Sequence, residues 1–191
     1  PFNMPEQVSA YVAKVIRYET NPGNDDPTYL GRSFFFCSDQ MRDISGGEHN
    51  VVARAFPSTI TADTVTGIEQ SRGDDPSPYN LPATELLPVL SQGYGVVNII
   101  AHGAFTKFGV RSSGYNNAPI SSFRTDTVQV GTDQITRLDP NGRVSLYYSL
   151  ACDNGAFDKN SPPFNVTQPN VATALLALPE AGAVAFVANS R

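Results

Sequence analysis

Two residues suited to nucleophilic chemistry follow two apolar, strand-like segments of the sequence. His102 comes directly after the run at 96–101 and is followed by Gly103, and Cys152 comes shortly after the run at 144–150. A cysteine thiolate is a strong nucleophile, and a neighbouring imidazole can activate it and later protonate a leaving amine. If both segments are strands of one parallel sheet, their carboxyl ends meet at one edge. His102 and Cys152 are therefore a candidate catalytic pair.

The residues beside this pair strengthen the catalytic interpretation. Gly103 has no side chain, so a substrate backbone can approach it closely. Its N–H and that of Cys152 can then form an oxyanion hole. Taken singly, Cys152 is more typical of a small buried thiol and His102 of a hydrogen-bonded loop residue. Their occurrence together, with Gly after the histidine and Ala before the cysteine, favours catalysis.

The elements that must position the pair alternate between apolar strands and helices. Continuous apolar strands separated by helices are typical of a parallel sheet covered on both faces, and sites in such sheets lie beyond the carboxyl ends of the strands. The strands are expected at 33–37, 63–68, 96–101, 144–150 and 183–188, and the helices at 7–17, 81–90, 132–138 and 170–178, with one or two further helical turns at 49–56.

Length and charge limit the classes of protein. The chain has 191 residues, which suits a single domain, and 40% of them are hydrophobic, which is enough for a packed core. Its net charge is -5 and it contains few lysines, so nucleic-acid binding is not expected. No apolar run reaches the ~20 residues of a membrane span. Two cysteines are too few for a disulfide scaffold or a zinc cluster.

The two ends of the sequence suggest a piece of a longer polypeptide. The chain begins with Pro1 rather than Met and shows no signal segment. It ends at Arg191, just after an apolar strand at 183–188. We therefore expect residues 1–191 to form the N-terminal part of one larger domain that continues past Arg191.

Several stretches resemble one family of peptidases. NIIAHG and YYSLACDNGAF resemble the paired His-Gly and Ala-Cys motifs of clan CD cysteine peptidases, which have a caspase-like fold, and most closely those of the gingipain family. The resemblance extends to VIRYETNP with YLGRSFFFCSD, to EHNVV, to GTDQITRLDPNGRV and to ATALLALPEAGAVAFVANS. It implies a three-layer α/β caspase-like sandwich with a mostly parallel sheet, incomplete in this chain.

The resemblance also implies roles for individual residues. His102 and Cys152 are the catalytic dyad, and the N–H groups of Gly103 and Cys152 are the oxyanion donors. Asp39 falls where the family has an acidic residue beyond its first strand and is a candidate to orient His102. The competing interpretation of Asp39 is a solvated loop acid.

The substrate pocket follows from the same resemblance. Leu150 and Ala151 are expected to line it. The arginine-cleaving members have an acidic residue shortly before the helix that EHNVV resembles, and Asp43 is the acidic residue of this chain nearest to that position. A buried carboxylate at that position pairs bidentately with a guanidinium. The loop between His102 and Cys152 is longer than in the gingipains.

A caspase-like sheet places its strands in the order second, first, third, fourth. The strand before His102 then lies between the strand that ends near Asp39 and the strand that leads to Cys152, with neighbours ~4.8 Å apart. Cys37 and Cys152 would be two strands apart, ~9–10 Å, which is too far for a disulfide. Cys37 is therefore expected to be a buried structural thiol, and His49 a surface or helix-start residue.

The function expected from these observations is a cysteine endopeptidase that cleaves after arginine. A protein or peptide is its substrate, and cleavage of its own precursor after Arg191 would leave the downstream fragment bound as a second chain. The alternatives are another caspase-like peptidase, of clostripain or metacaspase type, and a catalytically silent surface or binding domain. The resemblance also suggests a bacterial protein that is secreted or on the cell surface.

No cofactor is required for this chemistry. The acidic pairs Asp25-Asp26 and Asp74-Asp75 can hold structural calcium together with loop carbonyl groups, a role that the gingipain resemblance supports. The competing interpretation is that both pairs are solvated turns.

Overall fold

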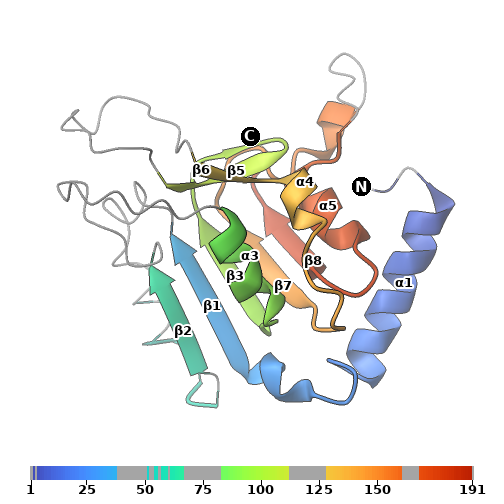
Figure 1. Ribbon diagram of the computed structural model, residues 1–191, viewed down its shortest axis with the longest axis vertical. Coiled ribbons are helices and arrows are strands. Elements are labelled where there is room, and N and C mark those ends of the chain that lie inside the picture. The colour runs from blue at the N-terminus through green and yellow to red at the C-terminus, as the bar shows by residue number, and fades with distance from the viewer. Residues whose placement is uncertain are drawn as a thin grey trace.

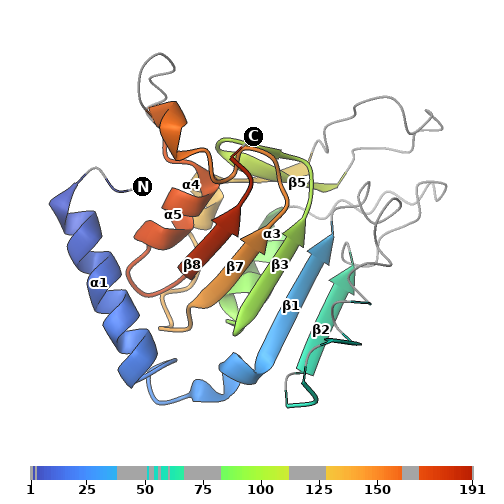
Figure 2. The same cartoon turned by 180° about the vertical axis from the view of Figure 1, so that it is seen from behind.

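A five-stranded sheet forms the centre of the protein (Figures 1 and 2). The computed structural model describes residues 2, 4–37, 51, 54–55, 57–59, 61–66, 83–111, 128–160 and 168–190. The strand order is β2-β1-β3-β7-β8, and each neighbouring pair is parallel. The order of the first four strands is the one that the resemblance to caspase-like sheets implied, whereas the place of β8 was not predicted. The strands are β1 (Arg32–Cys37), β2 (Thr61–Thr66), β3 (Val96–Ile100), β7 (Ser145–Ser149) and β8 (Ala183–Ala188).

One face of this sheet is packed against helices. Side chains alternate between the two faces of a strand, and in β7 Ser145, Tyr147 and Ser149 are buried whereas Leu146 and Tyr148 are exposed. Figure 1 shows α3 in front of the sheet, and Figure 2 shows the strands from the opposite side. The core cluster between the sheet and its helices includes Phe34, Phe36, Val97, Ile99, Tyr147, Leu86, Leu90 and Leu175.

The helices form where the sequence predicts them, with shifted ends. Two 3-10 helices are also present in the described residues, η1 (Pro27–Gly31) and η2 (Phe157–Asn160). Asn170 precedes the last helix and its side chain accepts a hydrogen bond from the Thr173 N–H at 2.7 Å, so it is the N-cap. The helices are α1 (Pro5–Thr20), α3 (Ala83–Ser91), α4 (Thr132–Ile135) and α5 (Val171–Ala177).

The first helix is attached to the sheet edge by polar contacts. Lys14 is 1% exposed, and its Nζ donates to the carbonyl oxygens of Leu176 and Leu178, each at 2.7 Å. The Tyr11 hydroxyl donates to the carbonyl oxygen of Val184 at 2.8 Å. A cation at the C-terminal end of a helix satisfies carbonyl groups that lack helical partners. Lys14, which belongs to α1, does this for the C-terminal end of α5.

A second sheet, absent from the sequence-based expectation, lies over the carboxyl end of the main one (Figure 1). It is antiparallel, with strand order β4-β5-β6, and comprises β4 (Gly103–Ala104), β5 (Lys107–Arg111) and β6 (Val128–Gly131). The turn between β4 and β5 is anchored through its carbonyl groups. Phe105 accepts from the Val171 N–H at 3.1 Å and Thr106 from the Thr132 N–H at 2.9 Å.

Candidate active site

His102 and Cys152 lie beyond adjacent strands at equivalent positions. Ile99 of β3 is in register with Ser149 of β7, and each of the two candidate residues comes three positions later. The ladder continues past the strand ends, because the Leu150 N–H donates to the carbonyl oxygen of Ile99 at 2.8 Å. The imidazole is partly buried, with a buried Nε2 atom, and the Cys152 thiol is exposed and not in a disulfide. The structure therefore brings the two segments to one edge of the sheet.

Gly103 touches the backbone of the cysteine segment. A Cβ atom at this position would come within 2.4 Å of the Cys152 carbonyl oxygen and 2.6 Å of the Cys152 nitrogen. Cβ atoms do not approach backbone atoms so closely, and only glycine fits here. The sequence analysis explained this glycine by the approach of a substrate, and the structure adds the approach of the chain's own Cys152.

The β4–β5 hairpin orients the N–H of Gly103. The Gly109 N–H donates to the carbonyl oxygen of His102 at 2.7 Å, and Gly103 is the partner of Phe108 in the ladder. Hydrogen-bonded and non-hydrogen-bonded pairs alternate in antiparallel strands. Since His102 and Gly109 are bonded, Gly103 and Phe108 are the non-bonded pair. The N–H of Gly103 therefore points away from β5.

The turn after β7, which begins at Cys152, is held by backbone hydrogen bonds. The next residue, Asp153, has φ +61°, in the left-handed region, which an aspartate tolerates better than most side chains. The carbonyl oxygen of Asp153 accepts from the Ala156 N–H at 3.1 Å, and the Gly155 N–H donates to the carbonyl oxygen of Asn189 at 3.0 Å. These bonds tie the turn to the end of β8.

Asn154 belongs to this site, although the sequence analysis assigned it no role. Its side chain is 0% exposed, and Nδ2 donates to the carbonyl oxygens of Ala104 at 2.8 Å and Lys107 at 3.1 Å. The hairpin after His102 and the turn around Cys152 are therefore linked by one buried amide. The available signal was its position in the polar segment that follows an apolar strand.

The predicted pocket residues have different surroundings. The Leu150 side chain is 38% exposed, and its carbonyl oxygen accepts from Asn189 Nδ2 at 3.2 Å. Ala151 is 0% exposed and belongs to the core cluster. A substrate contact at Ala151 would therefore involve its backbone, whereas Leu150 presents a side chain.

The acidic candidates Asp39 and Asp43, together with His49, lie outside the described residues. Cys37 is the last residue of β1 and is in register with Ile100 of β3, but its side chain is not among those described. The orienting role of Asp39 and the pocket role of Asp43 stay predictions.

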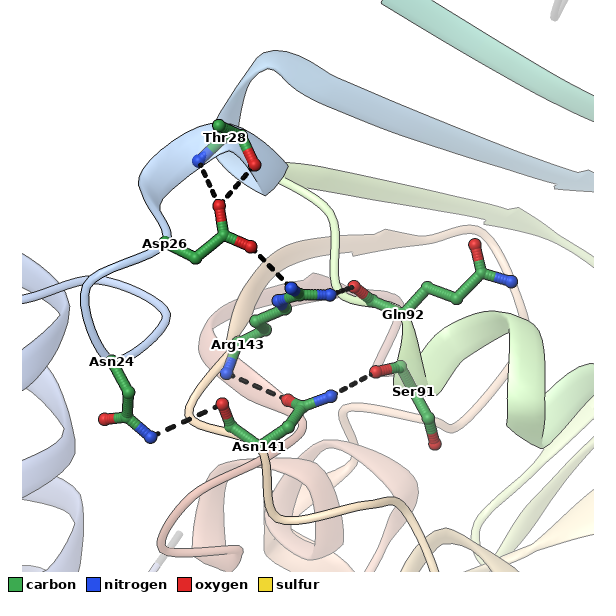
Figure 3. A network of polar contacts seen from close by, with 7 residues as sticks. All are labelled: Asn24, Asp26, Thr28, Ser91, Gln92, Asn141 and Arg143. Atoms are coloured by element: carbon green, nitrogen blue, oxygen red, sulfur yellow. Dashed lines mark hydrogen bonds and ion pairs between the residues drawn. The ribbon is translucent and has the colours of Figure 1, made fainter.

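In one of the two acidic pairs that were candidates for calcium, Asp25-Asp26, the second carboxylate has other partners. Asp26 accepts hydrogen bonds from the Thr28 N–H and hydroxyl and pairs with Arg143 (Figure 3). These contacts, the Thr28 hydroxyl foremost, hold the pKa of the Asp26 carboxyl below its usual value. Arg143 also donates to the carbonyl oxygen of Gln92 at 3.1 Å. Asp26 thus joins the loop before β1 to the loop before β7, at the sheet end opposite Cys152.

The other acidic pair, Asp74-Asp75, lies outside the described residues, so calcium binding stays a prediction. Within the described ranges, no cluster of at least three histidine, cysteine, aspartate or glutamate side chains has the arrangement of a metal site. None of the helices described above has both the length and the apolar character needed to cross a bilayer.

The parallel sheet, its strand order and the covering helices define a caspase-like α/β domain. The chain belongs to peptidase family C25, because the model of that family matches residues 1–191. This is the gingipain family, so the membership confirms the resemblance to gingipain-type cysteine peptidases and favours it over the clostripain and metacaspase alternatives. No match was found among curated proteins.

Three solved structures share the fold. One, described as a protease, has 17% identity and a TM-score of 0.62, covering 98% of this chain and 34% of its own. The arginine-specific cysteine proteinase gingipain R (RgpB) has 18% identity and a TM-score of 0.62, covering 97% and 37%. A complex of the pro- and mature domains of RgpB from Porphyromonas gingivalis has 18% identity and a TM-score of 0.62, covering 99% and 39%. This chain therefore spans little more than one third of their lengths.

Proposed function

We propose that this chain carries the catalytic dyad of a cysteine endopeptidase, formed by His102 and Cys152. The observation that carries the proposal is their equivalent position beyond Ile99 and Ser149, the paired residues of β3 and β7. The contact of Gly103 with the Cys152 backbone supports it, since it brings the two segments together. Membership of peptidase family C25 supports it independently.

In the proposed reaction, the Cys152 thiolate attacks the carbonyl carbon of the scissile peptide bond. The N–H groups of Gly103 and Cys152 donate to the resulting oxyanion, and the orientation of the Gly103 N–H away from β5 supports this role. His102, oriented by Asp39, protonates the leaving amine as the C–N bond breaks and a thioester forms. Water then attacks the thioester, gives a proton to His102 and releases the carboxylic acid and the thiolate.

The proposed specificity is for arginine before the cleaved bond. A carboxylate from Asp43 would pair bidentately with the guanidinium, with Leu150 and the backbone of Ala151 beside the arginine stem. The similarity to a proteinase described as arginine-specific supports this choice. Lysine is expected to bind less well, since an ammonium group cannot form the two parallel hydrogen bonds.

The proposed setting is a larger, secreted or surface-attached protein of a bacterium. The fold of this chain matches little more than one third of each similar solved chain, one of which is described as a complex between pro- and mature domains. We include in the proposal a downstream part of the same precursor that binds this chain and is separated from it after Arg191. The extracellular location typical of gingipains supports the proposed location.

A binding domain without activity is the second candidate, and thiol labelling separates the two. An enzyme with an activated thiol should react with a low concentration of iodoacetamide at Cys152, identified by mass spectrometry. Labelling should disappear in Cys152→Ala and slow in His102→Ala, and Cys152→Ala should also abolish peptide hydrolysis while it retains substrate affinity. Labelling no faster than that of the unfolded chain, with no hydrolysis of arginine peptides, would favour the binding domain.

A further inference from the structure

Asn154 bridges the hairpin that follows β3 and the turn that follows β7. Nδ2 donates to the carbonyl oxygens of Ala104 and Lys107, which are paired at the end of the hairpin. A longer contact of 3.4 Å reaches the carbonyl oxygen of Cys152 within its own turn. The side chain is fully buried, so these bonds do not compete with water.

The opposite end of the same amide is also held. The Ser149 hydroxyl lies 3.4 Å from Asn154 Oδ1 and donates to it, and its oxygen accepts from the Ala151 N–H at 3.2 Å. The main-chain carbonyl oxygen of Asn154 accepts from the Ala172 N–H at 3.1 Å. Carbonyl oxygens on one side and a hydroxyl on the other require two donors and one acceptor, which an asparagine amide supplies.

We propose that Asn154 is a positioning residue for the peptidase reaction, an inference that rests on the proposed function. The hairpin begins directly after His102, and the turn begins at Cys152. By clamping the hairpin to the turn, Asn154 sets the separation of the imidazole from the thiol. A displacement of about 1 Å in such a pair can cost on the order of 10²-fold in rate.

Asn154→Asp tests the clamp with almost no change of shape. An ionised carboxylate offers no donor to the carbonyl oxygens of Ala104 and Lys107, whereas a protonated carboxyl offers one. We expect kcat to fall by about 10–100-fold near neutral pH while KM changes little. The ratio of variant to wild-type kcat should rise as the pH is lowered, because the protonated form regains part of the clamp.

A matched control separates positioning from general stability. Ser145 is 2% exposed and its Oγ accepts from the Tyr94 N–H at 3.2 Å, at the end of β7 far from Cys152. Ser145→Ala should lower the melting temperature and leave the kcat of the folded fraction unchanged. Ser149→Ala removes the hydroxyl that donates to Oδ1 and accepts from the Ala151 N–H but leaves both Nδ2 bonds, so it should lower kcat less than Asn154→Asp.

The outcomes distinguish this inference from the proposed function. If wild type is active and Cys152→Ala is inactive, but Asn154→Asp has the kcat of Ser145→Ala at equal folded fraction, the positioning role is overturned. A lower kcat that shows no recovery in acid overturns it as well. If Cys152→Ala is as active as wild type, the proposed function itself fails, whatever the asparagine variants do.

Discussion

Gly103 lies directly against the backbone of Cys152, and the space between them is too small for any side chain at position 103. The Cβ of an alanine at Gly103 would be 2.4 Å from the Cys152 carbonyl oxygen and 2.7 Å from the Ala151 carbonyl carbon. This contact joins two segments that are far apart in the sequence, at the edge of the sheet where both strands end. It provides a way to change the relative position of the two segments without altering either candidate catalytic side chain.

Gly103→Ala should therefore impair activity more than stability. The new methyl group must push the Cys152 turn away from the hairpin, since backbone atoms cannot yield as a side chain does. We expect a loss of kcat/KM on the order of 10²-fold and a destabilisation of about 1–3 kcal/mol. Steady-state kinetics and thermal unfolding measure the two effects.

Gly31→Ala is the matched control for this prediction. Its nearest contact would be the Thr59 carbonyl oxygen at 3.6 Å, an ordinary van der Waals distance. It should therefore leave both kcat/KM and the melting temperature close to wild type. Similar losses in both glycine variants would show that the contact with Cys152 has no special importance.

Lys14 should make the stability of the chain depend on pH. Burial lowers the pKa of Lys14 to about 7, from 10.5 in the unfolded chain. Between these values the unfolded state binds more protons than the folded state, so stability rises with pH. The free energy of unfolding should increase by roughly 1.5 kcal/mol between about pH 7 and about pH 8.5. Urea unfolding at these two pH values measures it.

Lys14→Met isolates this contribution. The variant loses the bonds to Leu176 and Leu178 together with the titrating group, so its stability should rise less over the same pH interval. Lys107→Met is the control, because the Lys107 side chain is exposed and its loss should leave the pH dependence unchanged. Equal pH dependence in wild type and Lys14→Met would contradict the prediction.

The alternation of apolar strands and helices made the main sheet predictable. The run at 183–188 forms β8 with the expected ends, as continuous apolar segments in a parallel sheet do, although only its first two residues, Ala183 and Val184, are buried. The β4-β5-β6 sheet was not predicted, because β4 has only two residues, Gly103–Ala104, and carries no periodicity of its own. The turn between β4 and β5 is hydrogen-bonded to the first residues of α4 and α5, which are distant in the sequence and which no local pattern encodes.

The orientation of α1 shows where periodicity misleads. Met4, Val8, Val12 and Ile16 recur at helical spacing but are 46–55% exposed, whereas Lys14 is buried. Hydrophobicity alone would turn the opposite face toward the core. The carbonyl groups at the end of α5 require a donor, and that requirement comes from tertiary structure rather than from the sequence of α1. Asn154 was missed for the same reason, since its partners lie in another segment.

The proposed arginine preference depends on Asp43. Asp43→Asn should lower kcat/KM for arginine substrates by about 10²–10³-fold, because the guanidinium loses a charged partner. Activity on substrates with a neutral first residue should change little. Asp139→Asn, which alters an exposed acid in the loop before β7, is the control. An unchanged preference for arginine in Asp43→Asn would assign the pocket carboxylate to another acidic residue.

We extend the proposal to the surface that the downstream part contacts, an exposed apolar patch on the main sheet. Leu146 (39% exposed), Tyr148 (41%) and Val187 (53%) lie on the sheet face opposite α3, and Tyr148 is in register with Val187. Tyr148→Lys with Val187→Lys should leave the isolated chain folded but weaken its co-purification with the co-expressed downstream fragment. Val12→Lys with Ile16→Lys on α1 is the control. Equal retention of the fragment by both double variants would exclude this patch as the contact.

Separation of the two parts after Arg191 is expected to be catalysed by the enzyme itself, because arginine is the residue that the proposed pocket accepts. The longer precursor carrying Cys152→Ala should therefore appear as a single chain. Addition of active enzyme should split it after Arg191, as shown by mass spectrometry of the fragments, whereas Arg191→Gln should block the cleavage. The fragments should remain together on size-exclusion chromatography if the downstream part covers the apolar face as proposed. Two chains from the inactive precursor, with no enzyme added, would show that another protease makes the cut.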